Sequence, residues 1–120
     1  MLNNASGVDH IYIATGYTDL RRGIDGLVGI IQSSFSLDPY QNCLFLFCGR
    51  RTDRIKALLW EGDGFLLLYK RLETGKFQWP RSESELKELS PQQYRWLTEG
   101  LMIEQKKTIP KVWPGSLSSP

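Results

Sequence analysis

The sequence predicts an α+β fold: a four- to five-stranded, mostly antiparallel sheet with a central β-hairpin, one amphipathic helix after the first strand and one C-terminal helix. Three observations lead to this prediction. Residues 55–60 and 65–72 are apolar runs separated by Glu-Gly-Asp-Gly, a strong signal for a β-hairpin. Residues 24–35 repeat apolar side chains with helical periodicity. Residues 43–48 (CLFLFC) are continuously apolar, which is typical of a strand buried on both faces.

The first part of the chain is expected to form a strand and then a helix that packs on the sheet. Residues 8–15 (VDHIYIAT) are rich in β-branched and aromatic side chains and predict the strand. The helix is expected from Gly23, and three of its glycines lie at a spacing of three. Each costs about 1 kcal/mol relative to Ala, so they predict close backbone packing on the sheet. The inward stripe comprises Ile24, Leu27, Val28, Ile31 and Phe35.

The central hairpin is expected to have one core face and one outward face, because side chains alternate along a strand. A two-residue loop at Gly62-Asp63 would place Trp60 opposite Phe65 and Lys56 opposite Tyr69. A three-residue loop would exchange the two faces. The core face is predicted to carry Ile55, Ala57, Leu59, Leu66, Leu68 and Leu72, interrupted by Lys70. The outward face is predicted to carry Arg54, Lys56, Leu58, Trp60, Phe65, Leu67, Tyr69 and Arg71.

The segments after the hairpin predict a further strand and a helix. A short strand is expected at residues 76–79, while residues 82–89 are ambiguous between a helical turn and an irregular strand. Ser90, Pro91 and Gln93 form a capping-box pattern. The helix should therefore run from Pro91 to about Glu99 and end at Gly100, with helices covering one face of the sheet. Its inward stripe is expected to be Tyr94, Leu97 and Leu101.

These elements predict one globular domain over residues 1–103, followed by a flexible basic tail with several prolines at residues 104–120. Charge is unevenly distributed, although the net charge is only +2. Residues 50–81 hold eight Lys or Arg against four acidic residues, whereas residues 82–104 hold two against five. A basic centre beside an acidic segment indicates a polyanion or an acidic protein as partner.

Other residue patterns argue against a metal, cofactor, membrane or secretion function. Cys43 and Cys48 lie five residues apart on one predicted strand, so they should point to opposite faces as free thiols. His10 has no partner at a recognisable spacing, and no spacing of acidic residues singles out a magnesium pair for a nuclease. The sequence has no long apolar span and no signal peptide pattern. A cytoplasmic protein without catalytic residues is expected.

Two strings in the sequence resemble a known family. They are TDLRRGIDGL, at residues 18–27, and LFLFCGRRTDRIKALLWEGDGFLLLYKRLETGKFQWP, at residues 44–80. Together they resemble the accessory protein TnpB, the product of the second open reading frame of bacterial insertion sequences of family sixty-six. The resemblance implies a protein that assists a separately encoded transposase, with transposon DNA, the transposase and other proteins of the element as partners. It implies no catalytic residues.

The basic hairpin is the candidate nucleic-acid surface, because cations can neutralise phosphates and exposed aromatic rings can stack on bases. The candidate contacts are Arg50, Arg51, Arg54, Lys56, Trp60, Tyr69, Lys70, Arg71 and Lys76. A solvated sheet face whose aromatics cover a second small core under the C-terminal helix is the competing interpretation. A module that holds the transposase without touching DNA is the alternative function.

Arg21 and Arg22, just before the first helix, are a further possible anion contact. There, Asp19 could accept bonds from helix amides or could pair with Arg21 inside the turn. The second arrangement would be structural.

Overall fold

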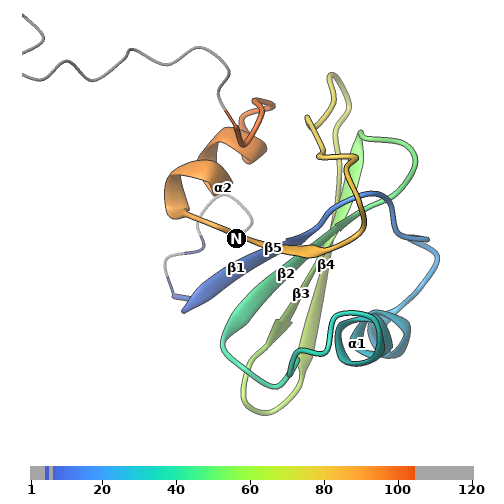
Figure 1. Cartoon of the computed structure of the whole chain (residues 1–120), viewed down its shortest axis with the longest axis vertical. Helices are drawn as coiled ribbons and strands as arrows, with labels where there is room; N and C mark the ends of the chain where they lie inside the picture. The colour runs from blue at the N-terminus through green and yellow to red at the C-terminus, as the bar shows by residue number, and fades with distance from the viewer. Residues whose placement is uncertain (1–4, 6, 105–120) are drawn as a thin grey trace, which may run out of the picture.

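The structure, a computed structural model, describes residue 5 and residues 7–104 (Figure 1). Of the predicted tail, only Glu104 falls inside this range. The described chain forms five strands and two helices in the order β1, α1, β2, β3, β4, β5, α2. Their bounds are β1 (His10–Ala14), α1 (Ile24–Ser33), β2 (Cys43–Cys48), β3 (Arg54–Trp60), β4 (Phe65–Arg71), β5 (Leu86–Leu89) and α2 (Pro91–Thr98).

The strands form one sheet in the order β4-β3-β2-β1-β5. Strands β1 and β2 are parallel, and the three other neighbouring pairs are antiparallel. The predicted α+β class and mostly antiparallel sheet are therefore confirmed. The hairpin of β3 and β4 is not central, because β1 pairs with the other side of β2 and β5 then extends the sheet from β1. Strand β4 is consequently an edge strand.

Strand β2 occupies the middle of the sheet, and all six of its residues are buried. Leu44, Leu46 and Cys48 belong to one hydrophobic cluster, while Cys43, Phe45 and Phe47 belong to another. The two clusters lie on opposite faces because successive side chains alternate. The prediction of a strand buried on both faces is confirmed, and the two free cysteines point to opposite faces as expected.

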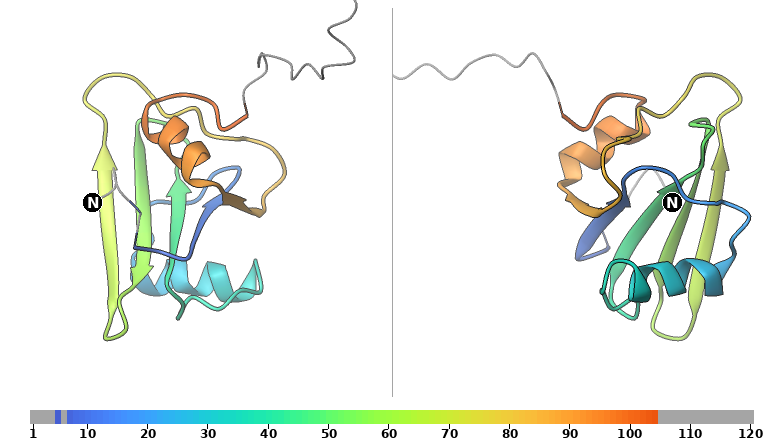
Figure 2. Two further views of the ribbon diagram at one scale, coloured as in Figure 1. Left: turned by 90° about the vertical axis from the view of Figure 1, so that its left-hand side faces the viewer. Right: turned by 45° about the vertical axis from the view of Figure 1, so that its right-hand side comes forward.

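The two helices cover opposite faces of the sheet, which corrects the expectation that one face carries both (Figure 2). Leu27 and Ile31 of α1 pack in the cluster with Phe45, whereas Tyr94 and Leu97 of α2 pack in the cluster with Leu46. The physical reason is that β2 carries apolar side chains on both faces, so both faces of the sheet must be shielded from water. Helix α1 is the crossover between parallel strands, and α2 follows the opposite edge strand β5.

The predicted hairpin register is confirmed, with Trp60 opposite Phe65 and Lys56 opposite Tyr69. The amide of Glu61 donates to the Gly64 carbonyl at 2.9 Å and closes a two-residue turn. Gly62 has a φ of +90°, a value that favours glycine. The face with Ile55, Ala57, Leu59 and Leu68 joins the core on the α2 side, as predicted.

The opposite face of the hairpin is not fully outward, which corrects a second expectation. Leu58 is completely buried under α1, and Phe65 and Leu67 pack partly against the same cluster. A core on this face therefore exists, but the expectation that it lies under the C-terminal helix was wrong, because it packs under α1. The other end, with Arg54, Lys56 and Tyr69, remains at least partly open to solvent.

The segment after the hairpin differs from its prediction. Residues 76–79 form an irregular connection and no strand, while the ambiguous segment contains β5. Phe77 and Trp79 are buried in the connection, and the Trp79 indole donates to the Ala14 carbonyl at 2.9 Å. Alternating aromatic residues here anchor a loop to the core, which gives the same sequence pattern as a strand.

Helix α2 has the predicted capping box, in which the Ser90 side chain accepts from the Gln93 amide and the Gln93 side chain accepts from the Ser90 amide. Leu101 was expected to face inward but is 45% exposed. The reason is Gly100, whose φ of +82° turns the chain after the helix. Ile103 is buried against the core instead.

Helix α1 begins at Ile24 and carries the predicted stripe as far as Ile31, while Phe35 packs on the same cluster from beyond the end of the helix. The glycines of the helix do not approach the sheet. Apart from the backbone of its own helix, no described atom would lie within 4 Å of a Cβ atom at Gly29. A Cβ at Gly26 would meet the Arg22 side chain at 3.0 Å and no strand. The inference of close backbone packing on the sheet was wrong, because glycine spacing alone does not show which face of a helix is covered.

Candidate nucleic-acid interface

A basic cleft lies where the open end of the hairpin meets two loops. The loops connect β1 with α1 and β2 with β3, and both lie at the same end of the sheet (Figure 1). The amide of Thr18 in the first loop donates to the Cys48 carbonyl at the end of β2 at 2.8 Å. The cleft is lined by Tyr17, Thr18, Asp19, Leu20, Arg21, Gly49, Arg50, Arg51, Arg54, Lys56, Leu67 and Tyr69.

Asp19 shapes the first loop. Its carboxylate accepts from the Arg21 amide at 3.0 Å and from the Arg21 guanidinium at 2.8 to 3.2 Å. These hydrogen bonds with Arg21 lower the pKa of Asp19 from 3.8 to about 2. Of the two roles considered for Asp19, the structure shows the turn pair, and the carboxylate bonds the Arg21 amide ahead of the helix. The charge of Arg21 in the cleft is therefore already paired with the Asp19 carboxylate.

Arg81 joins the two loops and was not among the predicted site residues. Its guanidinium donates to the Gly16 carbonyl at 2.6 Å and to the Gly49 carbonyl at 2.7 Å. A third, longer contact reaches the Arg50 carbonyl at 3.2 Å. A planar fork with several donors suits this bridge between separate carbonyls. No sequence signal distinguishes Arg81 from neighbouring cations, because its partners lie far away in the chain.

Tyr17 and Arg50 form an exposed pair at the cleft. The Arg50 guanidinium lies 4.5 Å from the centre of the Tyr17 ring and also donates to the Tyr17 hydroxyl at 2.9 Å. The ring is 57% exposed. Tyr17 was not among the predicted site residues, although an aromatic residue next to Thr-Asp-Leu-Arg-Arg in a polar loop is a signal that could have indicated it.

The hairpin contributes the opposite wall of the cleft. Arg54 donates to the Asp53 carboxylate at 2.9 Å, and this bond raises the pKa of the Arg54 guanidinium. The Lys56 ammonium donates to the Arg22 carbonyl at 3.0 Å, which is a neutral oxygen and not a carboxylate. Tyr69, opposite Lys56 in the hairpin, is 53% exposed.

The cleft has an excess of positive charge. Its five cationic side chains meet two carboxylates, those of Asp19 and Asp53, which leaves an excess of three charges. Arg50 and Lys56 are the two that contact neutral oxygens instead of carboxylates in the described part of the chain. They are therefore the cations best placed to attract an anion, since their charges are not neutralised by a neighbour.

The structure brings some predicted site residues together and separates others. The cleft contains Arg50, Arg51, Arg54, Lys56 and Tyr69, together with Arg21. The remaining residues lie elsewhere. Arg71 stands opposite Arg54 in the hairpin register and contacts Glu73 at 3.5 Å. Lys70 is on the opposite face of the hairpin, beside Ile55. Lys76 is in the connection after β4. Arg22 lies against α1 with its side chain near Gly26.

Trp60 is at the turn end of the hairpin, away from the cleft. Its ring packs against Tyr40 at 5.0 Å and Phe65 at 4.9 Å between centroids. Tyr40 in turn lies 5.2 Å from Phe65 and is 51% exposed. We call these three residues the tip cluster. Trp60 is thus held by two neighbouring rings, whereas Tyr69 stands open beside the basic wall.

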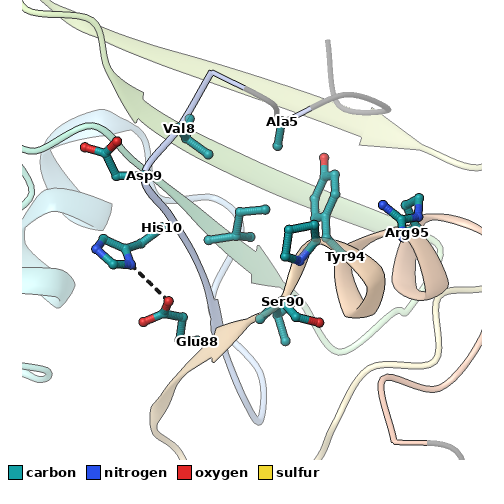
Figure 3. A pocket seen from close by; sticks show the side chains of 11 residues that line it. Ala5, Val8, Asp9, His10, Glu88, Ser90, Tyr94 and Arg95 are labelled. Atoms are coloured by element: carbon teal, nitrogen blue, oxygen red, sulfur yellow. Dashed lines mark hydrogen bonds and ion pairs between the residues drawn. The ribbon is translucent and has the colours of Figure 1, made fainter.

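A second pocket lies at the other side of the sheet, between β1, β5 and the start of α2 (Figure 3). His10 and Glu88 form a hydrogen bond of 2.9 Å at its rim, and both side chains are about half exposed. Tyr94 reaches into the pocket from α2, and burial raises its pKa to about 12. Within residues 5 and 7–104, no group of three or more His, Cys, Asp or Glu side chains could hold a metal ion.

The cysteines are buried thiols. Burial raises the pKa of Cys48 to about 11, so its thiol stays protonated at neutral pH. No helix among the described residues is long and apolar enough to cross a membrane.

The fold and the cleft define a small α+β protein with a basic cleft on its surface. The sequence comparison gives its family. The family model described as IS66 Orf2 like protein matches residues 9–108, so the chain belongs to this family of insertion-sequence proteins. Membership implies an accessory role in transposition and confirms the resemblance found in the sequence. No solved structure matches the chain.

Two similar proteins come from Sinorhizobium fredii (strain NBRC 101917 / NGR234). The first, named "Uncharacterized protein y4jC", is 38% identical over 100 residues, which cover 83% of this chain and 86% of that protein. The second, "Uncharacterized protein y4hO", is 37% identical over 91 residues, which cover 76% of this chain and 79% of that protein. The similarity therefore extends over most of each protein.

Proposed function

We propose that the chain is a non-enzymatic accessory protein that binds transposon DNA through the basic cleft. The observation that carries this proposal is the convergence of cations from two loops and the hairpin on one cleft. Neutralising phosphates releases counterions from DNA, which supplies most non-specific affinity. Two exposed rings, Tyr17 and Tyr69, flank the cations and are suited to stacking on bases or packing on sugars.

A salt titration with terminal-repeat DNA tests the proposal. Binding should weaken steeply with salt, since each phosphate contact contributes about −0.9 to the slope of log K against log salt. Replacing Arg50 and Lys56 together by Ala should weaken binding and reduce this slope by about 1.8, because two contacts are lost. These two residues are chosen because no carboxylate neutralises them in the structure.

The matched control is a double replacement of Lys70 and Lys76 by Ala. It removes the same net charge from positions outside the cleft, so most of the affinity and slope should remain. Equal losses in the two double variants would contradict a site at the cleft. Absence of DNA binding at low salt, or magnesium-dependent nicking of supercoiled plasmid by the purified chain, would contradict the proposal as a whole.

The tip cluster favours the alternative function, a protein-interaction module that holds the transposase without contacting DNA. Three aromatic rings at the hairpin turn, with Tyr40 half exposed, resemble the aromatic anchors of protein interfaces. A pull-down with the transposase in the presence of nuclease separates the two functions. An association that survives nuclease and is lost on Tyr40→Ser replacement supports the alternative, whereas an association bridged by DNA disappears with nuclease.

A further inference from the structure

Strand β4 lies at the edge of the sheet, and no other strand in the described part of the chain pairs with its outer side. It runs for seven residues in continuous register with β3 and contains no proline. Leu66, Leu67 and Leu68 at its middle are only half buried, although they continue both faces of the core. Natural proteins usually blunt such edges by shortening, bulges, proline or charged side chains such as Lys, because an unpaired strand invites another strand. Of these devices β4 has only the charges of Lys70 and Arg71, and these are its last two residues.

The hydrogen-bond pattern of the hairpin shows which backbone groups face the open edge. The bond from the Glu61 amide to the Gly64 carbonyl makes these residues a hydrogen-bonded pair. Because such pairs alternate along antiparallel strands, alternate residues of β4 bond to β3 and the others point their N–H and C=O groups outward. The outward set comprises Phe65, Leu67, Tyr69 and Arg71.

The two ends of β4 carry opposite charges. Glu61 and Asp63, both exposed, precede the strand in the turn, and Lys70 and Arg71 end it. An antiparallel copy of the same strand would therefore bring each basic end beside an acidic end. A parallel arrangement would place like charges together. The edge is thus self-complementary in charge as well as in backbone groups.

We propose that β4 pairs with β4 of a second copy of this chain, antiparallel and centred on Leu67. This register joins outward backbone groups from both copies, because Leu67 belongs to the outward set. It sets Asp63 opposite Arg71 of the second copy and Phe65 opposite Tyr69 of the second copy. It also places the leucines of the two copies side by side on both faces of the joined sheet. The exposed parts of Leu66, Leu67 and Leu68 are then removed from water.

The pairing would make one continuous sheet from two five-stranded halves. The two-fold axis of an antiparallel strand pair is perpendicular to the sheet, so both α1 helices lie on the same face. Arg54 and Lys56 share the α1 face with Leu58, so both basic clefts would also open on that face. The use of two clefts on one DNA rests on the proposed function, whereas the pairing itself does not.

A charge swap measured without DNA tests the pairing. Asp63 and Arg71 are eight residues apart along an extended segment, about 27 Å, so they cannot contact each other within one copy. Asp63→Arg and Arg71→Asp should each raise the dimer dissociation constant at least tenfold in sedimentation experiments on the full chain. The double variant should recover affinity, because opposite charges again meet across the junction. Glu99→Arg, an exposed charge reversal at the end of α2 and outside the paired strand, should have no effect.

Amide hydrogen exchange supplies the second measurement. The amides of Leu67 and Tyr69 should exchange slowly at high protein concentration and quickly after dilution, because only the second copy can accept their bonds. A monomer at every concentration reached, or a double variant as weak as the single ones, would overturn the proposal. Slow exchange that dilution does not change would also overturn it, since another segment of the same chain would then cover the edge.

Discussion

The Asp19 carboxylate shows how one residue organises the basic cleft. It holds both the amide and the guanidinium of Arg21, two residues further along the chain. The spacing between an aspartate and the second following residue is the usual geometry of an Asx turn. The loop therefore keeps its shape through local bonds, and Arg50, Arg54 and Lys56 supply the charge around it.

Acid should remove the contribution of Asp19 to stability. Its pKa is about 2 in the folded chain against an ordinary 3.8, so the folded state binds the proton less readily than the unfolded state. The stabilisation is then complete above the ordinary pKa and is lost as pH falls toward 2. An NMR titration of the Asp19 carboxyl group should give the low midpoint. The Asp19→Asn variant should lack this part of the pH dependence of unfolding, and a midpoint at 3.8 or above would contradict the pair.

At the scale of elements, helix α1 contains glycines that the packing does not require. Gly29 lies inside α1, and a Cβ atom added there would meet no described atom within 4 Å outside the backbone of its own helix. Gly62 in the hairpin turn, in contrast, has a φ of +90°. The same substitution should therefore have opposite effects at these two places. The helix tolerates a side chain, and the turn does not.

Gly29→Ala should stabilise the protein by about 0.5 to 1 kcal/mol, because alanine loses less backbone entropy in a helix interior. Gly62→Ala should destabilise it by ~1 kcal/mol or more, because a Cβ atom disfavours positive φ. Urea unfolding measures both changes as shifts in midpoint at constant slope. A destabilising Gly29→Ala would mean that α1 approaches another part of the molecule more closely than the structure shows.

At the scale of the whole molecule, Arg81 connects parts of the chain that sequence separates widely. It bonds carbonyls at Gly16 and Gly49, which belong to the two loops of the cleft. Trp79, two residues earlier, anchors the same connection to the Ala14 carbonyl. The irregular segment after the hairpin thus ties together the end of the sheet where the basic cleft lies.

Arg81→Lys should loosen both loops although it keeps the charge, because an ammonium group cannot span separate carbonyls as a guanidinium does. Losing about 1.4 kcal/mol of hydrogen bonding would raise the rate of amide exchange in residues 16–22 and 49–51 roughly tenfold. Arg95→Lys, an exposed change on α2, should leave these amides unchanged. Equal exchange in the two variants would show that Arg81 does not hold the loops.

The sequence by itself determined the features that depend on near neighbours in the chain. The turn at Gly62-Asp63 set the hairpin register, the apolar run at β2 predicted a strand buried on both faces, and Ser90 with Gln93 set the start of α2. The cations of the cleft were also recognised, because their charge is clustered in residues 50–56. Local turn chemistry and side-chain alternation are sufficient for each of these.

Only the tertiary structure decided which surfaces are covered. Helix α1 covers the turn end of the hairpin, while Tyr69 remains exposed. Phe77 and Trp79 are buried in a connection that is not a strand. Tyr17 and Arg81 belong to the structure of the cleft. These outcomes depend on contacts between residues more than 30 positions apart, and periodicity within one element does not contain them. Strand order has the same origin, since β4 lies at the edge of the sheet because β1 pairs with the other side of β2.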